Sequence, residues 1–135
     1  MALQYSVAVR NAQLDAWETA IGTSAVLKFR TGAPPASCAT ADSGTVLATL
    51  NLPSDWMAAA SAGAKSKSGT WEDTSADAAG TIGHFRIYDS GGSTCHEQGT
   101  VTATGGGGDM TVDNTNVASG QDVLVTSYTK TAGNA

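Results

Sequence analysis

One stretch of the chain, residues 81–102, constrains the fold more than any other because it has the pattern of a complete β-hairpin. Its sequence is TIGHFRIYDSGGSTCHEQGTVT. The first half alternates between two faces of an extended strand, with Phe85, Ile87 and Asp89 on one face and His84, Arg86 and Tyr88 on the other. Residues 90–93, SGGS, tolerate the positive φ that tight hairpin turns need. Residues 94–102 are then the return strand, so the fold is expected to be built around β-structure.

The length of the chain predicts a single domain over residues 1–135, since domains usually hold roughly 100 to 200 residues. A chain of this size buries about two thirds of its unfolded surface, so it can fold without a metal or a set of disulfides. Charged residues make up 14% of the chain, against about 25% in typical domains. Gly, Ala, Ser and Thr take their place, and a surface of small uncharged residues favours close packing against other copies.

The charge balance excludes several classes of function. The net charge is −5, and the seven Lys and Arg residues are scattered, so the clustered cations that bind nucleic-acid phosphates are missing. No apolar run approaches the ~20 residues that a membrane-spanning helix needs. The N-terminal sequence, MALQYSVAVRNAQLDAW, lacks the basic and continuous apolar regions of a signal peptide. We therefore expect no nucleic-acid or membrane partner, and synthesis as a soluble protein in a cytoplasm.

Residues 6–21 are predicted to form the one helix of the protein. The apolar residues of this segment recur at helical spacing and make a single stripe, formed by Val7, Leu14, Trp17 and Ile21. Ser6 suits the N-cap, and Gly22 suits the left-handed residue that commonly ends a helix. A helix of this length is marginal alone, so its stripe must dock either on the protein's own sheet or on a neighbouring subunit.

The remaining segments predict short strands separated by turns. In addition to the hairpin, strand patterns occur at residues 24–30, 45–52, 69–73, 109–113 and 121–131. In the strand at 69–73, Trp71 is expected to point inward. Residues 54–64 favour a short helical turn, residues 65–68 a loop, and the tetraglycine at 105–108 a flexible connection. The expected fold class is mostly β: an antiparallel β-sandwich or barrel of about seven short strands with one N-terminal α-helix.

The sequence predicts no catalytic, cofactor-binding or metal site. A nucleophilic triad needs a base beside a Ser or Cys, yet Cys95 and His96 are neighbours on a strand and must point to opposite faces. Zinc typically needs four ligands. His84 could come close to Cys95 or His96 through hairpin pairing, but the sequence has no second Cys or His pair at a useful spacing to complete the site. The carboxylates are scattered and serve equally well as turn residues. We therefore expect a protein that is not an enzyme.

The two cysteines, Cys38 and Cys95, are too few for a disulfide framework. They are interpreted either as two ordinary thiols or as the partners of a bond formed after release from the cell. That bond would lie within one chain or between two chains.

Four segments of the chain carry a resemblance that extends over nearly its whole length. They are NAQLDAWETAIGTSAVLKFRTGAPP, LATLNLPSDWM, GHFRIYDSGGSTCHEQGTV and the closing TAGNA. With these segments the chain resembles a family of small structural proteins of tailed bacteriophages. The resemblance implies a non-enzymatic part of the virion, present in many copies, and it transfers no functional residue.

From this resemblance we expect a capsid decoration, or cement, subunit that binds the major capsid protein and stabilises its lattice. It would be assembled in the host bacterial cytoplasm as a homo-oligomer, for example a trimer, and reside in the virion. Free ends and exposed aromatic residues are common anchors, so the expected contacts lie in the first five residues and at two later sites. The named contact residues are Leu3, Tyr5, Trp56, Met57 and Tyr128. The alternatives are a tail, neck or fibre-associated structural protein, or a module that binds a host receptor or glycan.

Overall fold

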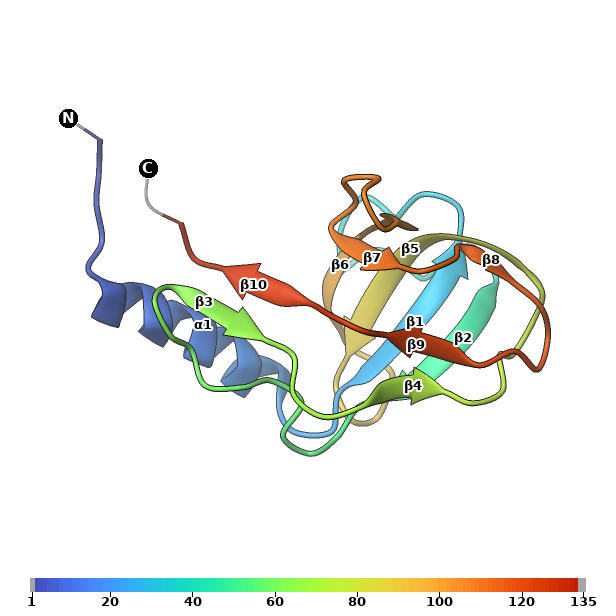
Figure 1. Ribbon diagram of the computed structural model, residues 1–135, viewed down its shortest axis with the longest axis horizontal. Helices are drawn as coiled ribbons and strands as arrows, with labels where there is room; N and C mark the ends of the chain where they lie inside the picture. The colour runs from blue at the N-terminus through green and yellow to red at the C-terminus, as the bar shows by residue number, and fades with distance from the viewer. Residues whose placement is uncertain (1, 134–135) are drawn as a thin grey trace.

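A computed structural model describes residues 2–133 and shows a mostly β protein with one N-terminal helix, which confirms the predicted fold class (Figure 1). Within these residues there are one helix and ten strands rather than about seven. In chain order they are α1 (Val7–Ile21), β1 (Val26–Thr31), β2 (Val46–Asn51), β3 (Ala64–Ser66), β4 (Trp71–Asp73), β5 (Gly80–Tyr88), β6 (Cys95–Ala103), β7 (Met110–Val112), β8 (Asn116–Val117), β9 (Val123–Val125) and β10 (Thr129–Thr131).

The predicted hairpin lies at the centre of the main sheet. The order of that sheet is β2-β1-β5-β6-β7, and β8 pairs with the start of β5. The turn is closed by the Asp89 amide, which donates to the Thr94 carbonyl at 3.1 Å. Residues 84–88 are all buried, because Phe85 and Ile87 face the hydrophobic core and the loop that contains Ser37 and Thr40 covers Arg86 on the opposite face.

The pairing of β6 with β7 is parallel, which corrects the prediction of a purely antiparallel fold. Val101 of β6 aligns with Met110 of β7. The loop that joins the two strands therefore has only to run back along the last residues of β6 before β7 begins. The glycine run makes this tight return possible, because a Cβ on Gly108 would come within 2.8 Å of the Thr102 backbone nitrogen. The tetraglycine therefore lies outside the strands, as expected, and forms the turn between β6 and β7.

A smaller sheet, β4 paired with β9, covers one face of the main sheet and completes a sandwich-like core. Trp71 of β4 points inward as predicted and is fully buried. Its neighbours in the core come from both layers and include Leu27, Phe29, Leu50, Phe85, Ile87 and Val125. Leu27 and Phe29 lie on one alternating face of β1, and Phe85 and Ile87 on one alternating face of β5, as the strand period predicted.

The helix and the β3–β10 pair form an extension at one end of the molecule, and residues 2–6 and 132–133 lie at that same end (Figure 1). The Ser6 side chain accepts a bond from the Val9 amide at 3.2 Å, and the Gly22 amide bonds the Glu18 carbonyl, so both predicted caps are confirmed. Leu14 and Ile21 are buried. The helix thus docks on its own chain, where the buried Lys65 ammonium of β3 lies 2.7 Å from the carboxylates of both Asp15 and Glu18.

Four local predictions were wrong. Residues 54–64 form no helix: they bend at 54–55, form isolated bridges at Met57 and Ser61, and turn at 62–63 before β3 begins. Residues 65–68 are partly β3, which exists because β10 pairs with it. The last predicted strand, 121–131, is interrupted at 126–128, since β9 pairs with β4 while β10 changes partner to β3. Val7 was assigned to the buried stripe but is exposed, as is Val9 on the same first turn of α1.

Candidate functional site

The N-terminal end of the molecule carries most of its exposed large apolar side chains. Within residues 2–133, five large hydrophobic residues are exposed, and four of them are Leu3, Tyr5, Val7 and Val9, with exposed fractions between 42% and 65%. We call these four residues the N-terminal apolar segment. Leu3 and Tyr5 were predicted contact residues, and the structure leaves both on the surface. Met1, at the start of the predicted contact segment, lies outside the described residues.

This segment has the composition of a docking surface. Residues 2–9, ALQYSVAV, contain no charged side chain. Residues 2–6 leave the helix as an extended strand-like arm that projects from the body of the protein (Figure 1). Apolar residues concentrated at one exposed site, rather than scattered singly, mark surfaces that bind another protein or a membrane.

The other three predicted contact residues are not on the surface, so that part of the prediction was wrong. Trp56 and Met57 are fully buried, and Tyr128 is also buried. The Trp56 indole N–H donates to the Gly22 carbonyl at 2.9 Å, and its ring lies between those of Trp17 and Trp71 at centroid distances of 5.3 and 5.9 Å. The Tyr128 hydroxyl donates to Glu97. These aromatic residues join the helical extension to the sandwich and have no face available to a partner.

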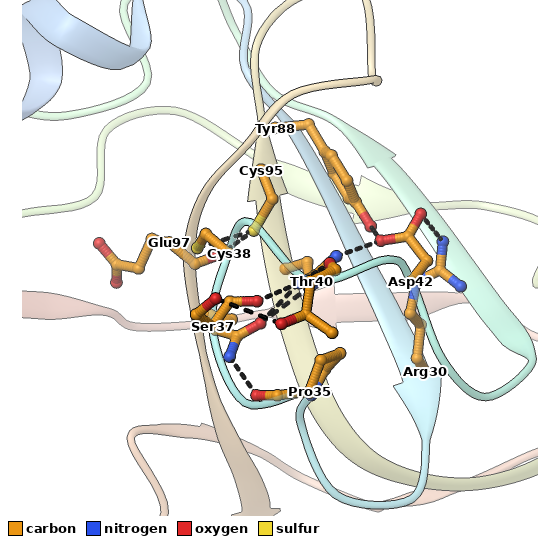
Figure 2. Close-up of polar contacts among 11 residues, drawn as sticks. Arg30, Pro35, Ser37, Cys38, Thr40, Asp42, Tyr88, Cys95 and Glu97 are labelled. Atoms are coloured by element: carbon orange, nitrogen blue, oxygen red, sulfur yellow. Dashed lines mark hydrogen bonds and ion pairs between the residues drawn. The ribbon is translucent and has the colours of Figure 1, made fainter.

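A buried polar cluster on the outer face of the main sheet was missed by sequence reasoning. Residues 32–45 form a loop across this face. The cluster consists of Asp42, which belongs to the loop and is exposed at its edge, and of Arg30, Arg86, Tyr88 and Gln98 on the strands; we call it the Arg86 cluster. Figure 2 shows Asp42 with Arg30 and Tyr88. The alternation of β5 correctly placed Arg86 and Tyr88 on one face. Nothing local to that strand indicated that residues about 45 positions earlier would cover it.

Arg86 is the centre of this cluster, because it holds both the loop and the neighbouring strand. Its guanidinium donates to the carbonyls of Ser37 at 2.9 Å and Thr40 at 3.0 Å. It also pairs with the Asp42 carboxylate and donates to the Gln98 side chain at 3.0 Å. Satisfying a buried guanidinium requires several acceptors at fixed positions, so these contacts give the loop one defined conformation.

Electrostatics within the cluster favour the ionised forms of the paired groups. Partial burial acts to raise the pKa of Asp42, but hydrogen bonds from Tyr88 and Arg86 outweigh it and hold that pKa below its usual value. Burial acts in the opposite direction on Arg86, yet its pairing with Asp42 leaves the pKa of the guanidinium raised. The cluster is therefore a charged structural network in which Arg86 and Tyr88 both bond Asp42, while the buried Nε of Arg30 has no hydrogen-bond partner among the described residues.

The loop also brings the two cysteines together. Cys38 lies in the loop and Cys95 begins β6, and the Cys95 thiol donates to the Cys38 sulfur at 2.9 Å (Figure 2). Burial, followed by the hydrogen bond and charge of Cys38, raises the pKa of Cys95 to about 12. Both residues are partly accessible to solvent.

The two histidines do not assemble into a reactive group in the described part of the chain. His84 is buried and bonds the Gly32 carbonyl through Nδ1 at 2.9 Å, whereas His96 is exposed. Within residues 2–133, neither histidine hydrogen-bonds a Ser, Thr or Cys side chain, and no three His, Cys, Asp or Glu residues are placed to share a metal ion. A polar hollow of about 310 Å³ beside β6 contains Glu97 and Asp109. Glu97 is held there by Tyr128 and Lys130, and Asp109 by Thr100.

Over the same residues, no helix combines the length and the apolar character needed to cross a bilayer. No protein-family model, curated protein or solved structure matches this chain.

Proposed function

We propose that this protein is a non-enzymatic structural subunit of a tailed-bacteriophage virion, and specifically a capsid decoration protein that binds and stabilises the major capsid protein lattice. The observation that carries the proposal is the N-terminal apolar segment, which extends from the arm into the first turn of α1 and has no charged residue, at one end of an otherwise well-packed β domain. Together with the resemblance to phage structural proteins, this segment supports a protein that functions by attaching to another virion protein.

Attachment through this segment is supported by its energetics. Fully burying one large apolar side chain contributes roughly 1.5 to 3 kcal/mol, and those of Leu3, Tyr5, Val7 and Val9 are about half exposed. Covering all four therefore contributes a few kcal/mol per subunit before the cost of ordering the arm. One such arm binds weakly, but several arms presented by an oligomer bind a repeating lattice far more strongly.

A receptor- or glycan-binding role receives less support from the structure. Sugar-binding grooves present the faces of aromatic rings, and this chain has three tryptophans. Trp56 and Trp71 are fully buried, and Trp17 is half-buried against Trp56. A tail, neck or fibre position uses the same kind of attachment surface, so copy number distinguishes it from a position on the head.

The first experiment is quantitative mass spectrometry of purified virions, scaled to the major capsid protein. A copy number comparable with that of the capsid protein is expected for lattice decoration. A few to a few dozen copies would overturn the head assignment in favour of the tail, neck or fibres. Absence from the particle would overturn the structural role itself.

The second experiment tests the attachment surface directly. Purified protein is added to particles that lack it, and bound protein is measured after sedimentation. The variant Leu3→Ser/Val7→Ser is expected to lose at least tenfold in affinity while keeping the circular dichroism of the parent. The matched control is Leu124→Ser on β9, which removes an exposed apolar side chain at the sandwich. Equal binding by all three proteins would exclude the arm as the attachment site.

A further inference from the structure

We infer that Cys38 and Cys95 are the site of an intramolecular disulfide, and that this bond fastens the 32–45 loop to β6 over the buried Arg86 cluster. The inference concerns the chain itself and stands whether or not the proposed function is correct.

The geometry places the two sulfur atoms almost at bonding distance. They are 2.9 Å apart, against about 2.05 Å in a disulfide, so less than about 1 Å of movement closes the gap. The residues are 57 positions apart in sequence, and the fold alone brings them together. Since each thiol already has the other as its neighbour within one chain, bond formation between two chains is disfavoured.

The position of the bond gives it a specific structural effect. Cys38 lies between Ser37 and Thr40, whose carbonyls accept hydrogen bonds from Arg86. It also lies four residues before Asp42, which pairs with Arg30 and Arg86. Lifting this part of the loop would separate Asp42 from Arg30 and would leave Gln98 as the remaining acceptor of the buried Arg86 guanidinium. In the reduced protein only non-covalent contacts oppose that motion, whereas a Cys38–Cys95 bond ties the loop directly to the sheet.

The chemistry requires an oxidant, for which we name a low-molecular-weight disulfide such as oxidised glutathione. Cys38 attacks first, because burial raises the pKa of Cys95 to about 12 and keeps that thiol protonated. The attack forms a mixed disulfide and releases one reduced glutathione. Cys95 then attacks the Cys38 sulfur, its proton passes to the departing glutathione thiolate, and the internal bond forms. Two protein thiols are oxidised and one glutathione disulfide is reduced to two thiols.

The redox state of the surroundings determines when the Cys38–Cys95 bond forms. A reducing cytoplasm keeps such thiols reduced, and an oxidising exterior allows the bond to form. Partial exposure of both residues gives a small oxidant access to them without unfolding of the protein.

The test uses the full chain, purified in reductant and then incubated with oxidised glutathione. Intact-mass analysis is expected to show the loss of two hydrogen atoms without addition of glutathione, and non-reducing peptide mapping should recover one linked peptide pair containing Cys38 and Cys95. The melting temperature should rise by roughly 10 °C on oxidation, as expected for a bond that closes a loop of this length. Hydrogen exchange at residues 37–42 should slow by at least tenfold.

The same protein kept in reductant is the baseline, and Cys38→Ser/Cys95→Ser is the matched control whose melting temperature should not respond to oxidised glutathione. Stable glutathione adducts on both cysteines, or a reducible dimer on a non-reducing gel, would overturn the intramolecular bond. A linked peptide pair without slower exchange at residues 37–42 would overturn its effect on the loop.

Discussion

Arg86 and Asp42 form an ion pair across 44 residues of sequence, and the pair joins the central strand β5 to the loop that covers it. The Arg86 side chain is only 2% exposed, whereas that of Asp42 is 41% exposed. Arg86 is thus the buried partner and Asp42 the one at the edge of the cluster. Losing Arg86 and losing Asp42 should therefore have different consequences.

Replacing Arg86 with Met should destabilise the protein by about 2 to 4 kcal/mol, because the carbonyls of Ser37 and Thr40 lose their Arg86 donor and the Asp42 carboxylate loses one of its partners. Urea unfolding followed by circular dichroism measures the change. The matched control is Lys28→Met on neighbouring β1, where the ammonium only approaches the Tyr88 ring at 5.1 Å. That change should cost less than about 1 kcal/mol. Equal effects of the two substitutions would contradict a central role for Arg86.

The contribution of Asp42 to stability should disappear in acid. Its folded-state pKa lies below the ordinary value of 3.8, so the stabilisation is fully present above about pH 4 and is lost as the pH falls through the folded-state value. Because Asp42 is partly exposed, the difference between the parent and Asp42→Asn should be about 1 kcal/mol at pH 6. It should shrink below pH 4. Unfolding measured from pH 2 to pH 7 tests this, and a difference that stays constant to pH 2 would contradict it.

A double-mutant cycle shows whether this pH dependence belongs to the ion pair. In the Arg86→Met background, Asp42→Asn should change stability by less than in the parent at pH 6. Coupling between the two substitutions should also fade in acid. Additive effects at pH 6 would mean that Arg86 and Asp42 act independently.

Replacing Trp56 with Ala should unfold or strongly destabilise the protein, by about 3 to 5 kcal/mol, because the indole fills the junction between the helix and the sandwich. Thermal unfolding measures the loss. Leu124→Ala removes an exposed side chain and should stay within about 0.5 kcal/mol of the parent. A Trp56→Ala protein of normal stability that no longer binds particles would restore the surface-anchor hypothesis for this residue.

Replacing Gly83 with Ala should cost about 1 to 3 kcal/mol, because the added Cβ would lie 2.2 Å from the Gly32 carbonyl oxygen. Two backbone segments approach at this point, and the same carbonyl bonds the His84 ring, so the strands cannot simply separate. Gly133→Ala is the control, since its Cβ would meet no atom within 4 Å. The melting temperatures of both variants test this prediction. Equal melting temperatures would show that the backbone around Gly83 and Gly32 can move apart without loss of stability.

Much of the candidate site depends on contacts that no local pattern encodes. Leu3 and Tyr5 were identified as contacts because free ends commonly anchor proteins, and their exposure agrees with that reasoning. Trp56 and Tyr128 were selected by the same rule for aromatic residues and proved to be core. The rule fails there because a large aromatic ring suits a binding surface and a domain interior equally well.

The sequence by itself determined the elements whose causes are local. The alternation of residues 84–88, the SGGS turn, the caps at Ser6 and Gly22 and the inward Trp71 all follow from periodicity, backbone preference and hydrogen bonding over a few residues. Only the tertiary structure decided which distant segments meet: β7 beside β6, the 32–45 loop over Arg86, and Cys38 beside Cys95. These contacts depend on the register and order of strands across the whole sheet, because a side chain's position along its strand specifies the face it occupies but not what covers that face.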